Sequence, residues 1–141
     1  MKIKKMAIVL SAIMALSTLG GLSTSANNST DTVYSFTTIS TGWIYFTETR
    51  AKEDASGSYA YYVQGATQPN GTYFSIWSGG TNYTRNETAT LYVGQKRRIA
   101  QFVYENGKRN CYLGVSPRDY NSSKIAGLWS PDSVGSDPYA N

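Results

Sequence analysis

Carboxylates are the side chains of this chain best suited to acid–base chemistry, because the sequence contains no histidine. Two carboxyl groups that face each other about 5 to 9.5 Å apart, one with a raised pKa, can hydrolyse a glycosidic bond. Glu53 and Asp54 are neighbours and would face opposite ways on a strand, while Glu105 is expected beside Lys108 at a turn. The spacing of these carboxylates therefore gives little support to a hydrolase. The carboxylates considered are Glu48, Glu53, Asp54, Glu87, Glu105, Asp119, Asp132 and Asp137.

The missing histidine and the single cysteine exclude several other chemistries. A Ser-His-Asp or Cys-His pair and a histidine metal site cannot form. With only Cys111, neither an internal disulfide nor a multi-cysteine zinc site is available. We therefore predict no enzyme activity, no cofactor and no metal site. Cys111 is interpreted as a small buried core residue, the alternative being a reactive or intermolecular thiol.

Basic residues gather at two places. Lys96, Arg97 and Arg98 are consecutive, and Lys108 and Arg109 are expected nearby across a hairpin. Together with nearby tyrosines, such a patch could bind a polyanion such as nucleic acid, teichoic acid or lipid phosphate. The alternative is a solvated segment whose charges discourage edge-to-edge aggregation.

Aromatic residues are concentrated in two stretches that could stack on sugar rings. In the first, Tyr59 and Tyr61 would share one face of a strand while Tyr62 takes the other. The second stretch includes Tyr73 and Trp77. Because the chain is poor in leucine, many of these rings must also build the core, and the sequence does not choose which row faces solvent.

The elements that must position these residues are short strands. Runs of aromatic and β-branched residues alternate with turn-forming clusters, and no long stretch after residue 26 has a helical apolar period. This pattern predicts an all-β fold, an antiparallel β-sandwich or small barrel of about seven to eight short strands. The expected strands cover residues 33–39, 43–50, 58–64, 72–77, 89–93, 98–105, 108–115 and 124–129.

Asn106-Gly107 gives the most specific local prediction. Both residues accept a positive φ, so they are expected to form a two-residue type I′ turn between the strands at 98–105 and 108–115. The resulting register pairs Phe102 with Cys111 and places both on an apolar face.

The first 26 residues have the order of a secretory signal peptide: a start with three lysines, an uncharged apolar stretch, and small residues ending at Ala26. A membrane anchor is disfavoured, because a span needs about 20 predominantly apolar residues. Cleavage after Ala26 would lower the net charge from +4 to +1 by removing those lysines. We expect a signal peptide at 1–26, a flexible leader at 27–32 and a single all-β domain at 33–141.

Three stretches resemble a known family. They are residues 50–59 (RAKEDASGSY), residues 98–113 and residues 126–133 (AGLWSPDS). With the signal peptide in front, they resemble small exported proteins of Gram-positive bacteria that are known only as a domain of unknown function. Some members look bacteriocin-like or linked to export, and the resemblance implies no catalytic residues.

The last of these stretches also has an ordinary structural interpretation. Trp129 is expected to anchor the final strand in the core, and residues 130–133 to close a turn in which a side-chain oxygen satisfies the backbone. Residues 50–54 are expected to join a strand end to its turn by local charge pairing.

Together these observations predict a secreted or wall-associated monomer that is not an enzyme. We expect it to be bacteriocin-like or to interact with the cell envelope; the alternative is a carbohydrate- or wall-polymer-binding module, and a carboxylate-dependent hydrolase comes third. The expected partner is the envelope or a wall polymer rather than a specific nucleic acid, and no transmembrane segment is expected in the mature chain. Candidate binding residues are Lys96, Arg97, Arg98, Lys108, Arg109, Tyr59, Tyr61, Tyr73 and Trp77.

Overall fold

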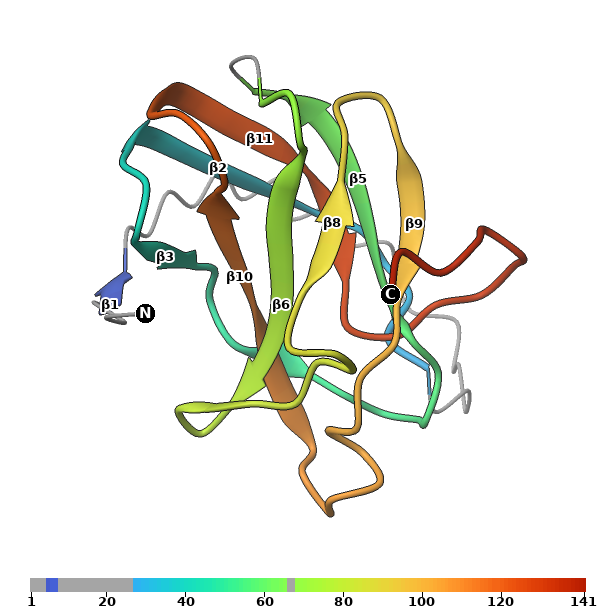
Figure 1. Cartoon of the computed structure of the whole chain (residues 1–141). Helices are drawn as coiled ribbons and strands as arrows, with labels where there is room; N and C mark the ends of the chain where they lie inside the picture. The colour runs from blue at the N-terminus through green and yellow to red at the C-terminus, as the bar shows by residue number, and fades with distance from the viewer. Residues whose placement is uncertain (1–4, 8–26, 66–67) are drawn as a thin grey trace.

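The structure, a computed structural model, describes residues 5–7, 27–65 and 68–141, which form strands and loops without a helix (Figure 1). Their strands make two sheets that pack face to face. The predicted all-β sandwich is therefore confirmed. Within the described residues, no helix of a length and apolarity that could cross a membrane is present. Of the predicted signal peptide, residues 1–4 and 8–26 lie outside the described residues.

The larger sheet has seven strands and is centred on β10 and β6, which pair antiparallel. The order along it is β1, β3, β10, β6, β7, with β4 also on β10 and β8 also on β6. β1 runs parallel to β3. The bounds are β1 (Lys5–Ala7), β3 (Ile44–Phe46), β4 (Arg50–Ala51), β6 (Thr72–Ser78), β7 (Thr81–Asn82), β8 (Ala89–Leu91) and β10 (Asn110–Pro117).

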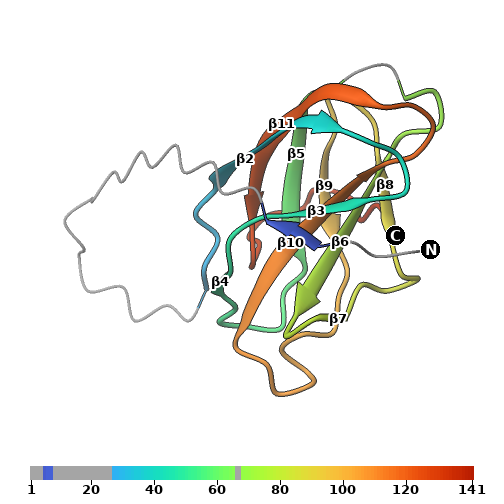
Figure 2. The same cartoon turned by 90° about the vertical axis from the view of Figure 1, so that its left-hand side faces the viewer.

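The smaller sheet has four antiparallel strands in the order β2, β11, β5, β9. Figure 2 shows β3, β10 and β6 of the larger sheet running in front of this layer. Residues 138–140 pair with the outer edge of β9, because Arg98 N–H donates to Pro138 O and Ala140 N–H donates to Arg98 O (both 2.9 Å). The bounds are β2 (Thr32–Ile39), β5 (Ser58–Gln64), β9 (Lys96–Ile99) and β11 (Ser122–Ser130).

The core between the sheets combines aromatic rings with aliphatic side chains. Tyr34, Tyr62 and Trp129 of the smaller sheet and Phe74 of the larger sheet are all buried. Phe74 makes edge-on contacts with the rings of Tyr62 and Tyr34, at centroid distances of 5.4 and 5.9 Å. Such pairs stabilise beyond their buried area. The interpretation of Trp129 as a core anchor is confirmed.

The strand expected at 43–50 is divided into β3 and β4 by residues 47–49, which are not in a strand. Thr47 still contacts the partner strand β10, since its N–H donates to Leu113 O and its hydroxyl accepts from Leu113 N–H, both at 2.9 Å. β3 and β4 therefore pair with β10 as two short, separate pieces.

The predicted hairpin at Asn106-Gly107 is wrong. β9 ends at Ile99 and pairs with β5, whereas β10 begins at Asn110 in the other sheet. Gly107 does take a positive φ of 75°, but it ends a compact turn in which Lys108 N–H donates to Val103 O. Val103 is fully buried, and Phe102 is 47 % exposed rather than paired with Cys111. Of the two predicted turn residues, Gly107 takes a positive φ but Asn106 does not, so the type I′ turn is absent and the chain passes from one sheet to the other.

Candidate functional site

The outer face of the smaller sheet carries a row of residues that crosses all four strands. Val33 lies opposite Leu128, Leu128 opposite Tyr61, and Tyr61 opposite Lys96. The Lys96 ammonium stands over the Tyr61 ring, 5.0 Å from its centroid, where the ring quadrupole attracts it. Because Tyr62 points inward, the alternation of β5 leaves Tyr61 half-buried on the outside.

A second row lies beside the first. Ser130 is opposite Tyr59, and Tyr59 is opposite Arg98. The Arg98 guanidinium stacks over Tyr139 at 4.2 Å and donates from Nε to Asp137 O at 2.6 Å. We call Tyr59, Tyr61, Lys96, Arg98 and Leu128 the tyrosine face.

A small pocket of about 150 Å³ opens next to Tyr59. Its lining is mainly polar and includes Ser29, Asp31, Tyr59, Ser130, Ser133 and Asp137. Partial burial of the carboxyl raises the pKa of Asp31, against smaller opposing effects of Ser130 and of the nearby cations. Burial, followed by the charges of Asp31 and Asp137, raises the pKa of Tyr59. The pocket thus presents hydroxyl groups and two carboxylates to one small space.

The residues predicted to bind are distributed over separate places. Lys96 and Arg98 join Tyr59 and Tyr61 on the tyrosine face, while Arg97 alternates to the other side of β9. Lys108 and Arg109 do not lie across a hairpin from them. They are in the loop between β9 and β10, at the lower tip in Figure 1, where the guanidinium of Arg109 stacks on Tyr104 at 3.8 Å.

The aromatic residues of β6 are also separated from the tyrosine face. Tyr73 is half-buried on the outer side of the larger sheet, with Arg118 5.2 Å from its ring centroid. Trp77 is buried against Phe46, and its indole N–H donates to Ser75 Oγ at 2.8 Å. Its ring therefore belongs to a packing cluster.

Asp31 was missed from the carboxylates considered, although it lines the pocket. It lies in the segment expected to be a flexible leader, and it directly precedes β2. In the structure that segment is held by Arg50, whose guanidinium donates to Thr30 O at 2.7 Å and to Asn28 Oδ1 at 3.0 Å. The sequence offered one signal for Asp31, namely its position just before the strand residues Val-Tyr-Ser-Phe at 33–36.

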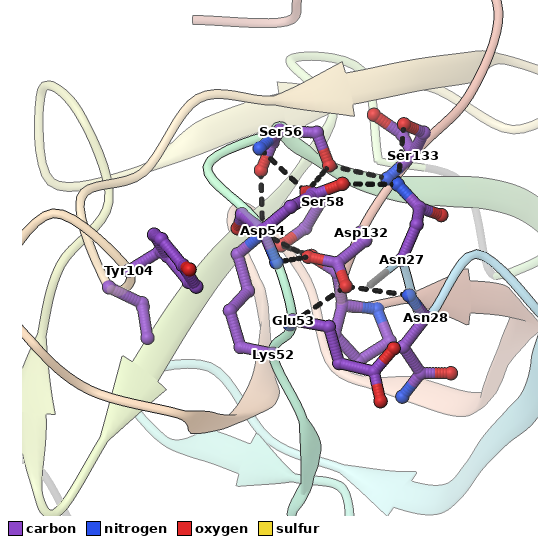
Figure 3. Close-up of polar contacts among 12 residues, drawn as sticks. Asn27, Asn28, Lys52, Glu53, Asp54, Ser56, Ser58, Tyr104, Asp132 and Ser133 are labelled. Atoms are coloured by element: carbon purple, nitrogen blue, oxygen red, sulfur yellow. Dashed lines mark hydrogen bonds and ion pairs between the residues drawn. The ribbon is translucent and has the colours of Figure 1, made fainter. Parts of the chain in front are cut away.

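Residues 50–54 and 129–133 meet through an ion pair between Lys52 and Asp132 (Figure 3). Both side chains are fully buried, 0 % exposed. The Lys52 ammonium contacts Asp132 Oδ1 and also donates to Asp54 O and Ser56 O, each at 2.7 Å. The local charge pairing expected for residues 50–54 is also present, since the Lys52 ammonium lies 3.9 Å from Asp54 Oδ1, and the long-range pair with Asp132 adds to it.

Backbone donors complete the environment of Asp132. Its Oδ2 accepts from Asn28 N–H at 2.7 Å and from Glu53 N–H at 2.9 Å. Within the segment 130–133, the Ser130 hydroxyl donates to Asp132 O at 2.7 Å, as expected of a side-chain oxygen there, whereas the Asp132 carboxylate contacts distant segments. A buried carboxylate needs such donors, because an unpaired charge in the interior is very costly.

Cys111 is buried beneath the larger sheet, as expected. Burial raises the pKa of its thiol to about 12, which outweighs the nearby cations Lys52 and Arg50. The group therefore stays a thiol at neutral pH and lacks the thiolate that reacts. In the described part of the chain, no group of three or more cysteine and acidic side chains is placed to hold a metal ion.

Fold and site together define a small two-sheet β-sandwich protein with a polar pocket beside an aromatic and cationic face. The chain belongs to the family described as "Protein of unknown function (DUF2712)", whose sequence model matches residues 22–133. The resemblance to a domain of unknown function is thereby confirmed. No curated protein and no solved structure matches the chain.

Proposed function

We propose that the chain is exported and, without catalysing a reaction, binds hydroxyl-rich polymers of the cell envelope through the tyrosine face and its pocket. The observation that carries this proposal is the position of Tyr59 and Tyr61. Tyr34 and Tyr62 are buried in the core, whereas Tyr59 and Tyr61 are half-buried on the outer face. The carboxylates of Asp31 and Asp137 line the pocket beside Tyr59. A secretory start of the sequence supports export.

Each part of the surface suits one feature of such a polymer. Half-exposed tyrosine rings offer an apolar surface on which a sugar ring can stack, with a hydroxyl at the edge. Carboxylates such as Asp31 and Asp137 accept short, strong hydrogen bonds from hydroxyl groups. Lys96 and Arg98 can attract the phosphates of an anionic wall polymer.

The size of the pocket favours binding over catalysis. Pockets that enclose a ligand usually measure about 300–1,000 Å³, and this one measures about 150 Å³. It can take one protruding group of a polymer whose rings lie on the open face, but it does not surround a scissile bond and exclude water from it.

Binding to purified cell walls, before and after removal of their wall polysaccharide, tests the proposal. We expect the wild-type protein to sediment with walls and the Tyr59→Ala/Tyr61→Ala double variant to bind at least about fivefold more weakly, because stacked rings contribute about 0.5–1.5 kcal/mol each. Tyr73→Ala is the matched control, since that ring lies on the other sheet. Equal binding by both variants would refute the role of the tyrosine face.

The second candidate is a bacteriocin-like activity in a Gram-positive producer, favoured by the signal-peptide pattern and the resemblance of residues 50–59 and 126–133. Purified protein added to related bacteria would then slow growth or cause envelope leakage. Wall binding without either effect would leave the binding function and remove the antagonistic one.

A hydrolase is the third candidate, and the joint presence of Asp31 and Asp137 in the pocket is the observation that favours it. Release of new reducing ends from walls by the wild-type protein, abolished in Asp31→Asn, would replace the binding proposal with glycoside hydrolysis. We expect no release from either protein.

A further inference from the structure

Asn27 and Asn28 lie at the buried ion pair, although they precede the first strand of the sandwich (Figure 3). The Asn27 amide donates from Nδ2 to Asp54 Oδ2 at 2.5 Å and reaches Ser133 O at 3.5 Å. Asn28 N–H donates to Asp132 Oδ2 at 2.7 Å, and Asp132 N–H donates back to Asn28 O at 3.2 Å. We call Asn27, Asn28, Lys52, Asp54 and Asp132 the buried cluster, in which Lys52 and Asp132 are fully buried and the other three residues are partly exposed.

The buried cluster contains more negative than positive charge. Lys52 supplies one ammonium, which lies against Asp132 and 3.9 Å from Asp54 Oδ1. Arg50 and Asp31 flank the cluster and add one charge of each sign, so the imbalance persists. One further cation at this position would balance the group.

Asn27 also carries an unsatisfied acceptor. Its Oδ1 is buried and has no hydrogen-bond partner in the described part of the structure. Buried side-chain acceptors are rarely left without a donor in folded proteins. Asn27 Oδ1 therefore needs a hydrogen-bond donor, and the carboxylates next to Asn27 need a further positive charge.

We propose that the α-ammonium of Asn27, created when the signal peptide is cleaved after Ala26, is the missing cation and donor of the buried cluster. This inference rests on the export in the proposed function. Cleavage is hydrolysis by a signal peptidase: one water is consumed, Ala26 keeps a carboxylate, and the amine left on Asn27 takes up a proton at neutral pH.

The covalent geometry brings the new charge to its partners. The α-nitrogen of Asn27 is three covalent bonds from the Asn28 nitrogen, which already donates to Asp132. It belongs to the residue whose side chain already donates to Asp54. An ammonium has three donors where the peptide N–H has one, so it can serve a carboxylate and Asn27 Oδ1 together.

Cleavage of the signal peptide then stabilises the fold through the α-ammonium of Asn27, which exists only after cleavage. The buried residues of both apolar clusters lie between Tyr34 and Trp129, so a chain starting at Asn27 keeps the whole core. It loses β1 and the three residue pairs that β1 makes with β3. Stability gained at the new terminus favours folding after export over folding before it.

The effect has a defined pH dependence. An amine that gains acidic partners has a higher pKa in the folded state than its unfolded value of about 7.7–8.0. Its stabilisation is therefore complete below about pH 7.7 and is lost as the pH rises through the folded-state pKa. The charged and titratable residues around Asn27 and its partner Asp132 are Arg50, Lys52, Asp31, Glu53, Asp54 and Asp132 itself.

Urea unfolding of two chains tests the inference: residues 27–141 with a free Asn27, and the same chain with Gly-Ser added in front. At pH 6 we expect an unfolding equilibrium constant about tenfold smaller for the free terminus, equivalent to a one-unit rise of the amine pKa. The difference should shrink at pH 10. Equal stability at both pH values would overturn the inference.

Two variants identify the partner. Asp54→Asn, a partly exposed position, should abolish most of the difference between free and extended chains. Asp119→Asn should preserve it, because that carboxylate caps Asn70 away from the cluster. A difference that survives Asp54→Asn unchanged would also overturn the assigned pairing.

The mass of the protein exported from the full gene separates this inference from the proposed function. A product starting at Asn27 together with equal stabilities would refute only the role of the terminus. A product that is not exported would refute the proposed function and this inference together, and one that starts at another residue would refute the assignment of Asn27.

Discussion

Replacing Lys52 by methionine should show how strongly the buried ion pair holds the fold. Lys52→Met keeps most of the side-chain volume but leaves the Asp132 carboxylate, which is fully buried, without its cation. It also removes the donor to Asp54 O and Ser56 O. Removing one partner of a buried pair costs about 3–5 kcal/mol, since an uncompensated charge stays in the interior.

Tryptophan fluorescence in urea measures this loss, because Trp129 is buried in the core three residues before Asp132. With a slope of about 1–2 kcal/mol per molar urea, the midpoint should fall by roughly 1.5–5 M. Lys124→Met is the control: Lys124 is exposed on β11, the strand that carries Trp129, so its loss should change stability by less than about 0.5 kcal/mol.

The double variant Lys52→Met/Asp132→Asn keeps the test decisive if the single variant hardly folds. It carries neither charge, so we expect it to be more stable than the sum of the two single losses by about 2 kcal/mol. A loss below about 1 kcal/mol for Lys52→Met, the range of exposed pairs, would refute the reasoning. Strict additivity of the two changes would refute it as well.

Two further predictions concern buried positions of the sandwich, Cys111 and Gly127. The Cys111 thiol, with its pKa raised to about 12 by burial, should react with a thiol reagent at pH 8 only after denaturation; prompt labelling of the native protein would contradict the buried assignment. Gly127→Ala should lower the free energy of unfolding by at least about 2 kcal/mol, because its methyl group would meet the backbone oxygen of Tyr61 and the hydroxyl of Tyr34; an unchanged thermal midpoint in calorimetry would show that the strands can move apart there.

Local patterns in the sequence predicted most of the strands and the direction of several side chains, but not the end of β9 at Ile99 or the short strand β7. The alternation in β5 correctly separated Tyr59 and Tyr61 from Tyr62, since it depends only on the period of a strand. Gly107 adopts the conformation that its type favours. The hairpin failed because a turn residue fixes local dihedral angles, but not which sheet the next strand joins.

The candidate site was harder to predict because its parts are distant in the sequence. Lys52 and Asp132 are 80 residues apart, and each resembles an ordinary solvated charge in its own segment. Asp31 lies on the tyrosine-face side only because β2 pairs with β11, whose Ser130 lines the same pocket. No local period encodes such a meeting.

The buried cluster and the pocket are parts of one construction, which links stability to binding. Asn28 precedes the pocket residue Ser29, and Asp132 stands between the pocket residues Ser130 and Ser133. Fixing Asp132 against Asn28 therefore fixes two walls of the pocket relative to each other. The hydroxyl of Ser130 donates to Asp132 O at 2.7 Å, which also fixes Ser130 relative to Asp132. A variant that weakens the buried pair but still folds should consequently lose pocket-dependent wall binding while the stacking surface of Tyr61 on β5 persists.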